Sequence, residues 1–126
     1  MKFIQTNQAP QAVGAYSQGV LVCKTLYVSG QLPFDPHTMT LVSNDIQKQT
    51  LQALKNIEAI VLEAGFERTD IVKCTVYMTH LEQFNLMNEV YAQFFGEHKP
   101  ARAAIGVARL PKEVAIEIDA IAHKST

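Results

Sequence analysis

The spacing of apolar residues predicts a long amphipathic helix in the first half of the chain. Over about residues 45–64, apolar side chains recur at intervals of three and four while polar side chains fill the other positions; the apolar set is Leu51, Leu54, Ile57, Val61 and Leu62. Asn44, with Gln47 three residues later, resembles a capping box at the start. Gly65 stands where the residue after a helix end is often glycine.

A second helix is predicted over about residues 81–96, with Thr79 and Glu82 as its capping pair. Its aromatic and apolar residues form one stripe, namely Phe84, Met87, Tyr91 and Phe94 or Phe95. We interpret this stripe as part of the core and not as a site for a cofactor.

Period-two alternation and β-rich runs predict the strands. Residues 20–23 and 26–29 form a predicted hairpin around Lys24 and Thr25, and residues 71–78 alternate as a strand does. Two more strands are expected at about residues 103–108 and 114–122. Two prolines interrupt regular structure over residues 33–37.

The order of these elements predicts a single α+β domain over residues 1–126, with two helices packed on one face of a mixed β-sheet. On the last strand Ala115, Glu117, Asp119 and Ile121 alternate with the apolar residues. Such a face is too apolar for free exposure to solvent and too polar for a core. We therefore expect it to be buried against other subunits.

Composition and charge narrow the possible partners. The chain has 126 residues, 48% hydrophobic and 18% charged, with a formal net charge of -1 and no run of Lys or Arg. A nucleic-acid binder normally shows a basic patch, so we expect no nucleic-acid partner. No stretch resembles a signal peptide or a membrane span, and a cytoplasmic protein is the expectation.

The cysteines and histidines indicate no metal site. Cys23 and Cys74 lie far apart among apolar neighbours, and we expect both to be buried, reduced thiols. The histidines show none of the spacings typical of zinc ligands and are expected at the surface or in loops; they are His37, His80, His98 and His123.

The candidate chemistry lies mostly near the C-terminus. Arg102 and Glu117 fall on two predicted strands, and a guanidinium with a carboxylate is suited to a small anionic substrate. Tyr16 and Ser29 add hydroxyl groups beside glycines that allow close approach of a ligand. These residues indicate a site for a small carboxylate that needs no cofactor.

Several short motifs, in order along the whole chain, closely resemble the Rid (YjgF-like) family, and most of all its reactive intermediate deaminase A branch. They are APQAVGAYSQG at residues 9–19, SGQLP at 29–33, NEVY at 88–91, PAR at 100–102, VARLPK at 107–112 and EI at 117–118. A set of motifs kept in order is far more specific than any one of them.

The resemblance implies a chorismate-mutase-like fold and a homotrimer with a site in each cleft between subunits. The implied reaction is hydrolysis of 2-iminobutanoate and 2-iminopropanoate to 2-oxo acids and ammonia, with no cofactor. By the same resemblance, Arg102 holds the substrate carboxylate and Glu117 orients or activates water. Tyr16, Ser29 and Asn88 shape the pocket.

The chain departs from the family pattern at three positions. Ala15 stands where proline is common, Ala104 where cysteine is common, and Gly106 where a polar or acidic residue is common. Without the thiol, water is the expected nucleophile, and the Ala104 backbone remains able to contact the ligand.

Each candidate residue also has a structural interpretation. Arg102 has the sequence position of an ordinary surface arginine at the start of a strand. Glu117 has that of an ion-pair partner at a subunit interface. Tyr16 and Ser29 fit ordinary turn and strand hydroxyls, and Asn88 fits an exposed helical residue.

Two alternative functions stay open. A carboxylate-binding regulatory module would use the same cleft without catalysis, and would not need Glu117. A ribonuclease or translation inhibitor is also associated with this family, but the balanced charge and the lack of Trp argue against it.

Overall fold

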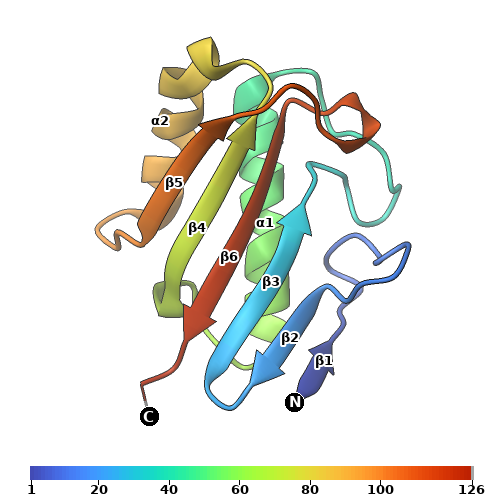
Figure 1. Ribbon diagram of the computed structural model, residues 1–126, viewed down its shortest axis with the longest axis vertical. Coiled ribbons are helices and arrows are strands. Elements are labelled where there is room, and N and C mark those ends of the chain that lie inside the picture. The colour runs from blue at the N-terminus through green and yellow to red at the C-terminus, as the bar shows by residue number, and fades with distance from the viewer. Residues whose placement is uncertain (126) are drawn as a thin grey trace.

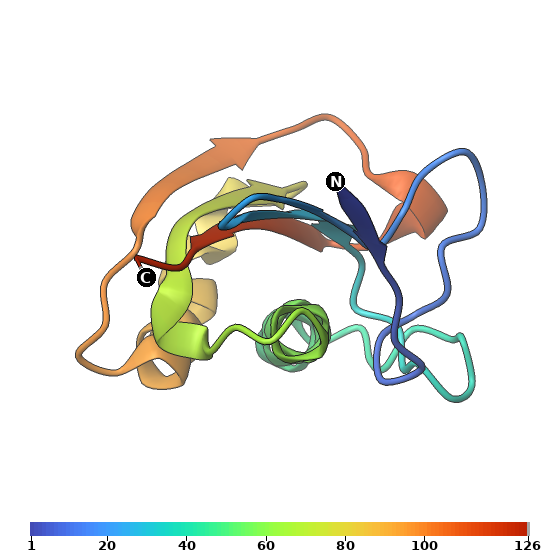
Figure 2. The ribbon, with the colours of Figure 1, turned by 90° about the horizontal axis from the view of Figure 1, so that it is seen from below.

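The computed structural model describes residues 1–125 and shows one mixed sheet with both α-helices on one face (Figures 1 and 2). The elements are β1 (Lys2–Ile4), β2 (Gly19–Val22), β3 (Thr25–Gln31), α1 (Ile46–Glu63), β4 (Ile71–Met78), α2 (Phe84–Phe95), β5 (Ala101–Gly106) and β6 (Ile116–His123). Short 3-10 turns precede β4, α2 and β6 at Arg68–Asp70, Leu81–Gln83 and Pro111–Glu113. The predicted α+β class is confirmed.

The six strands lie in the order β1-β2-β3-β6-β4-β5. All neighbours are antiparallel except β4 and β5, which are parallel and are joined through α2. A parallel pair needs a crossover connection, and α2 supplies it. The last strand, β6, therefore lies between β3 and β4 in the interior of the sheet, while β5 forms one edge.

The long helix α1 ends as expected but begins one residue later than expected. Gly65 has φ +84°; its N–H donates to Leu62, and the N–H of Phe66 donates to Val61, which makes a Schellman motif. The predicted cap Asn44 is wrong. Asp45 is the N-cap, and its carboxylate accepts the backbone N–H of Lys48 at 2.9 Å.

The second helix starts differently from the prediction. Leu81–Gln83 form a 3-10 turn, and α2 begins only at Phe84 with no side-chain cap. The capping role predicted for Thr79 is wrong, because its hydroxyl pairs with the adjacent His80 ring at 3.0 Å.

The predicted hairpin is present, but its strands end at different residues from those predicted. Val22 pairs with Thr25, so Cys23 and Lys24 form the turn of the β2-β3 hairpin. Cys23 is therefore exposed, with φ +53°, and its predicted burial is wrong. β5 begins two residues earlier than expected, and β1 was not predicted because three residues carry no periodic signal.

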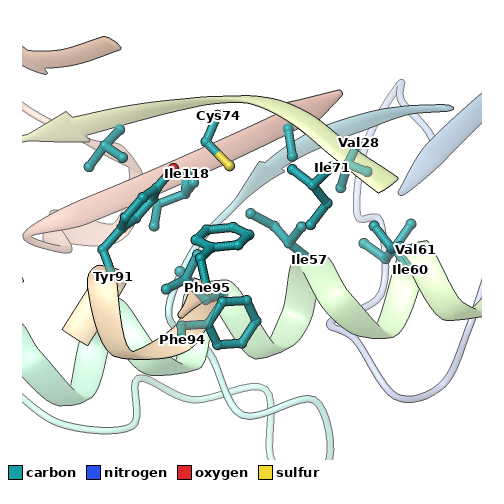
Figure 3. Packing of buried hydrophobic residues seen from close by; sticks show 14 of the residues in the cluster. Val28, Ile57, Ile60, Val61, Ile71, Cys74, Tyr91, Phe94, Phe95 and Ile118 are labelled. Atoms are coloured by element: carbon teal, nitrogen blue, oxygen red, sulfur yellow. The ribbon is translucent and has the colours of Figure 1, made fainter. Parts of the chain in front are cut away.

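The core lies between the helix-bearing face of the sheet and the two helices (Figure 3). Ile57, Ile60 and Val61 of α1 pack against β-sheet residues such as Ile71 and Ile118. Cys74 is buried in this cluster, as expected, and burial raises the pKa of its thiol to about 11. The thiol is therefore protonated near neutral pH and is a poor nucleophile.

Two further observations concern cofactors and membranes. Among the described residues, no group of three or more His, Cys, Asp or Glu side chains is arranged to hold a metal ion. No helix within residues 1–125 combines the length and apolar character needed to cross a membrane.

Candidate functional site

The strand register places Arg102 and Glu117 on opposite faces of the sheet. Arg102 of β5 is in register with Cys74 of β4, whose side chain points into the core. Glu117 of β6 is in register with Tyr77 of β4, three positions from Cys74 and therefore on the other face. The two residues expected to carry the chemistry do not meet within one copy of the chain.

Arg102 lies against one face of α2. Its NH1 donates to the side-chain oxygen of Asn88 at 2.6 Å. Its guanidinium carbon lies 4.8 Å from the centre of the Tyr91 ring and 5.3 Å from that of Phe84. The three partners occupy positions i, i+4 and i+7 of the helix and so share one face.

The three arginines of the chain differ in their anionic partners. Arg68 forms two hydrogen bonds with the Glu58 carboxylate, at 2.6 and 2.9 Å, and Arg109 pairs with Glu113. Within residues 1–125, no carboxylate lies within ion-pair distance of Arg102. Its positive charge is exposed and is not compensated in this part of the chain.

A cleft of about 340 Å³ opens beside this arginine. Its lining includes Asn88, Tyr91 and Arg102, together with the turn after α2 at His98, Lys99 and Pro100. A guanidinium offers five N–H donors, and Asn88 uses one of them. The arrangement can therefore bind a small anion through the remaining donors.

Glu117 lies in a larger cleft, of about 780 Å³, on the other side of the sheet. Tyr16 and Ser29 line the same cleft, as does Lys112 from the turn before β6. The structure thus places three of the candidate residues, Tyr16, Ser29 and Glu117, in one cleft. Tyr16 is about half exposed at the rim, on the loop that leads into β2.

The carboxylate of Glu117 is seated over an irregularity of β3. The register between β3 and β6 shifts between Val28 and Gln31, which places Ser29 and Gly30 in a bulge. A methyl group added at Gly30 would overlap the Glu117 carboxylate. The missing side chain of Gly30 therefore makes room for this carboxylate.

The surroundings of Glu117 make its carboxyl easier to protonate than a carboxyl in water. Burial, and then the negative charge of Asp119, raise the pKa of the Glu117 carboxyl. The hydroxyl of Tyr77 donates to Asp119 at 3.2 Å. No hydrogen bond to the Glu117 carboxylate forms from any residue of the described chain, so it remains able to accept a proton from a ligand or water.

A buried glutamine fixes the loop that carries Tyr16. The Gln18 amide accepts the Thr6 N–H at 2.7 Å and donates to the carbonyls of Thr6 and Pro10 at 3.1 and 2.7 Å. The Ser29 hydroxyl donates to the Ser17 carbonyl at 2.5 Å. The Ser29 proton is therefore used within the chain, while its oxygen can still accept a hydrogen bond.

Ala104 lies two residues after Arg102 on β5 and is half buried against the core. The proximity of Phe84 and Tyr91 to Arg102, and the presence of Lys112 in the Glu117 cleft, were not predicted from the sequence. The spacing of Phe84, Asn88 and Tyr91 was a usable signal for the first. No sequence pattern places Lys112 in the Glu117 cleft. Its position depends on the shape of the turn before β6, where Lys112 itself has φ +59°.

Comparison with known proteins agrees with the motifs. The family model described as endoribonuclease L-PSP matches residues 6–124. A RutC family protein of Pyrococcus horikoshii is 50% identical over 121 residues, covering 96% of each chain. The human 2-iminobutanoate/2-iminopropanoate deaminase is 47% identical over 121 residues, covering 96% of this chain and 88% of the human protein.

Solved structures extend the similarity to the fold. Escherichia coli TdcF with bound serine superposes with a TM-score of 0.95 at 46% identity, covering 99% of this chain and 100% of that one. The Escherichia coli YjgF gene product gives 0.95 at 45% identity, covering 98% and 99%. Since the family model and these relatives span nearly all of it, the chain belongs to the endoribonuclease L-PSP family, the Rid (YjgF-like) family that its motifs resemble.

Proposed function

We propose that the chain is a deaminase that hydrolyses 2-imino acids, among them 2-iminobutanoate and 2-iminopropanoate, to 2-oxo acids and ammonia. The observation that carries the proposal is Arg102, the one arginine without a carboxylate partner within the described residues, whose guanidinium faces a cleft. The names of relatives support the reaction class, since the human relative is a 2-iminobutanoate/2-iminopropanoate deaminase.

Arg102 binds the carboxylate of the substrate in this proposal. Asn88 accepts one N–H from NH1, and the Nε and NH2 donors meet no acceptor elsewhere in residues 1–125. Two parallel hydrogen bonds from a guanidinium match the geometry of a carboxylate. Binding at this end fixes the position of C2, the atom that water must reach.

Glu117 acts as the general base. Its carboxylate takes a proton from water as the water oxygen bonds to C2 and the C=N double bond becomes single. That proton then passes to the nitrogen, which gives a neutral amino alcohol. Glu117 next takes the hydroxyl proton and delivers it to the same nitrogen as the C=O bond forms and the C–N bond breaks, so that ammonia and the 2-oxo acid leave. A base of this kind typically contributes ~10² to 10⁴-fold to the rate.

Because the two residues lie on opposite faces of the sheet, the proposal needs a second copy of the chain. In a homotrimer, the Arg102 cleft of one copy would meet the Glu117 cleft of the next. The helix-free face of the sheet supports such an assembly, because it exposes the large apolar side chains of Phe3, Tyr27 and Ile105. Apolar exposure of this kind is typical of a protein interface.

The remaining residues shape the pocket. Tyr16 and Ser29 offer a hydroxyl and an acceptor oxygen beside Glu117. Asn88 accepts a hydrogen bond from NH1 and so fixes one side of the Arg102 guanidinium. The Ala104 backbone lies on the edge strand β5, where a ligand can reach its polar groups. Since no thiol stands at Ala104, water is the nucleophile.

A coupled assay tests the function. A pyridoxal-phosphate-dependent threonine or serine dehydratase generates the imine in place, and ammonia release is followed with and without catalytic amounts of the purified protein. We expect faster release with the wild type and no acceleration with Arg102→Ala at matched concentration. The Arg102→Ala control is needed because imines also hydrolyse unaided in water.

Two results would replace the proposal. Binding of 2-oxobutanoate without acceleration of ammonia release would favour a carboxylate-binding module that uses the same cleft. Cleavage of single-stranded RNA by the wild type, with no effect on ammonia release, would favour the nuclease implied by the family description.

A further inference from the structure

We infer that Tyr91 is a positioning residue for Arg102: its ring, buried in α2, supports the guanidinium in the orientation that binds a carboxylate. This inference rests on the proposed function only in the role of Arg102 as carboxylate ligand. The sequence predicted only a core role for Tyr91, and this inference adds a role in the site.

The geometry places an aromatic ring beneath a charge. The guanidinium carbon of Arg102 lies 4.8 Å from the centre of the Tyr91 ring, within the range of a cation–π interaction. Phe84 supplies a second ring at 5.3 Å. Arg102 is exposed while Tyr91 is only 6% exposed, so the ring is a fixed base for an otherwise mobile side chain.

The hydroxyl of Tyr91 has no role of this kind. It is buried and points toward the Cys74 thiol (Figure 3), which is a weak partner and forms no hydrogen bond of normal geometry with it; no other described residue bonds to it. A buried polar group without a partner lowers stability. The ring is therefore the part of Tyr91 that the site requires, and phenylalanine is expected to replace it.

A second arginine, in the 3-10 turn before β4, stacks against the same helix and provides an internal comparison. Arg68 lies 3.8 Å from the centre of the Phe94 ring, but it also binds the Glu58 carboxylate and the Phe94 carbonyl. Arg68 is thus fully engaged within the chain. Arg102 is stacked on α2 in a similar way and yet keeps its charge uncompensated, which is what a guanidinium held for an external anion needs.

The test measures the Kd of 2-oxobutanoate by titration calorimetry, together with kcat and KM for ammonia release. Tyr91→Leu should weaken 2-oxobutanoate binding about 3- to 10-fold and raise KM by a similar factor, with kcat little changed. Tyr91→Phe should keep the Kd within about twofold of the wild type and leave Tm equal or higher. Phe94→Leu, which removes a buried ring from the same helix, should lower Tm without changing the Kd.

Several outcomes would overturn the inference. These are an unchanged Kd in a folded Tyr91→Leu, an equal weakening by Phe94→Leu, or a wild type that does not bind 2-oxobutanoate. If Tyr91→Leu does not fold, Phe84→Leu at the half-buried second ring decides, with about a 2- to 3-fold weaker Kd expected and an unchanged Kd contradicting us. A wild type that binds 2-oxobutanoate but releases no ammonia removes the proposed function and leaves this series valid.

Discussion

The immediate neighbours of Glu117 and Arg102 give the two side chains different chemical properties. Glu117 is half buried near Asp119, and both effects raise the pKa of its carboxyl, which improves a general base that works near neutral pH. Arg102 is exposed and held by Asn88, Tyr91 and Phe84, so its charge is available for a ligand. The two kinds of surroundings can be tested separately.

The pH dependence of kcat should report on Glu117. Because the charge of Asp119 helps to raise the pKa of Glu117, Asp119→Asn should lower that pKa and move the acid limb of the kcat profile to lower pH. Tyr77, which donates to Asp119, and Lys73 are the titratable groups of β4 on this face, and Lys112 lines the same cleft as Glu117. Glu117→Gln should lower kcat by about 10²- to 10⁴-fold while the Kd of 2-oxobutanoate changes little. An acid limb that stays in place in Asp119→Asn would contradict the assignment.

A second test concerns the role of Gly30 in positioning the Glu117 carboxylate. Gly30→Ala places a methyl group where the Glu117 carboxylate lies, so we expect kcat to fall about 10- to 100-fold through displacement of the base. Gly106→Ala is the matched control, since its added methyl group would meet only Leu81, at 3.5 Å. Equal kcat in the two variants would show that the position of Glu117 does not depend on Gly30.

At the scale of elements, the two helices have different ends. α1 has a side-chain cap at Asp45 and a Schellman motif after it, whereas α2 has no side-chain cap and follows a 3-10 turn. Because α1 packs on both β3 and β6, its stability supports the strands that carry Ser29 and Glu117. α2 has the additional task of presenting Asn88, Tyr91 and Phe84 to β5.

The position of the α1 cap is open to a stability measurement. Asp45→Ala should lower the free energy of unfolding by about 0.5–2 kcal/mol, because it leaves the Lys48 N–H without its acceptor. Asn44→Ala should change it by less than about 0.5 kcal/mol, since Asn44 is exposed and outside the cap. Urea unfolding of both variants checks this, and a larger loss in Asn44→Ala would reverse the assignment.

At the scale of the whole molecule, one copy of the chain holds two separate halves of the proposed site. The Arg102 half is built on β5 and α2, and the Glu117 half on β3, β6 and the loop before β2. Figure 2 shows that the other face of the sheet carries no helix, and this is the face on which we propose that further copies pack. Assembly and activity should therefore be inseparable.

Mixed oligomers test this division directly. Arg102→Ala and Glu117→Gln subunits, co-expressed with different affinity tags and purified through both, should form trimers in which about one of three sites is intact. We expect ammonia release at about one third of the wild-type rate, although each variant alone is inactive. Size exclusion with light scattering should give a trimer for each preparation. Inactive mixed trimers would place both residues in a site within one copy.

The sequence by itself determined the features that depend on local pattern. The 3.6-residue period located α1 and α2, alternation located β4 and β6, and motifs along the whole chain indicated the family and the residues Arg102 and Glu117. These signals lie in neighbouring residues, so no knowledge of long-range contacts was needed. Apart from the short strand β1, which was not predicted, the errors lie at element ends, as at Asn44 and Cys23, where one residue of register decides between cap, turn and core.

Tertiary structure alone decided how the candidate residues are distributed. Strand pairing across the sheet put Arg102 and Glu117 on opposite faces, and packing of α2 on β5 put the Tyr91 ring beneath Arg102. The β3 bulge brought Gly30 under Glu117. Each of these depends on contacts between separate elements of the fold, and the alternation of side chains along a strand turns a single step of register into a change of face.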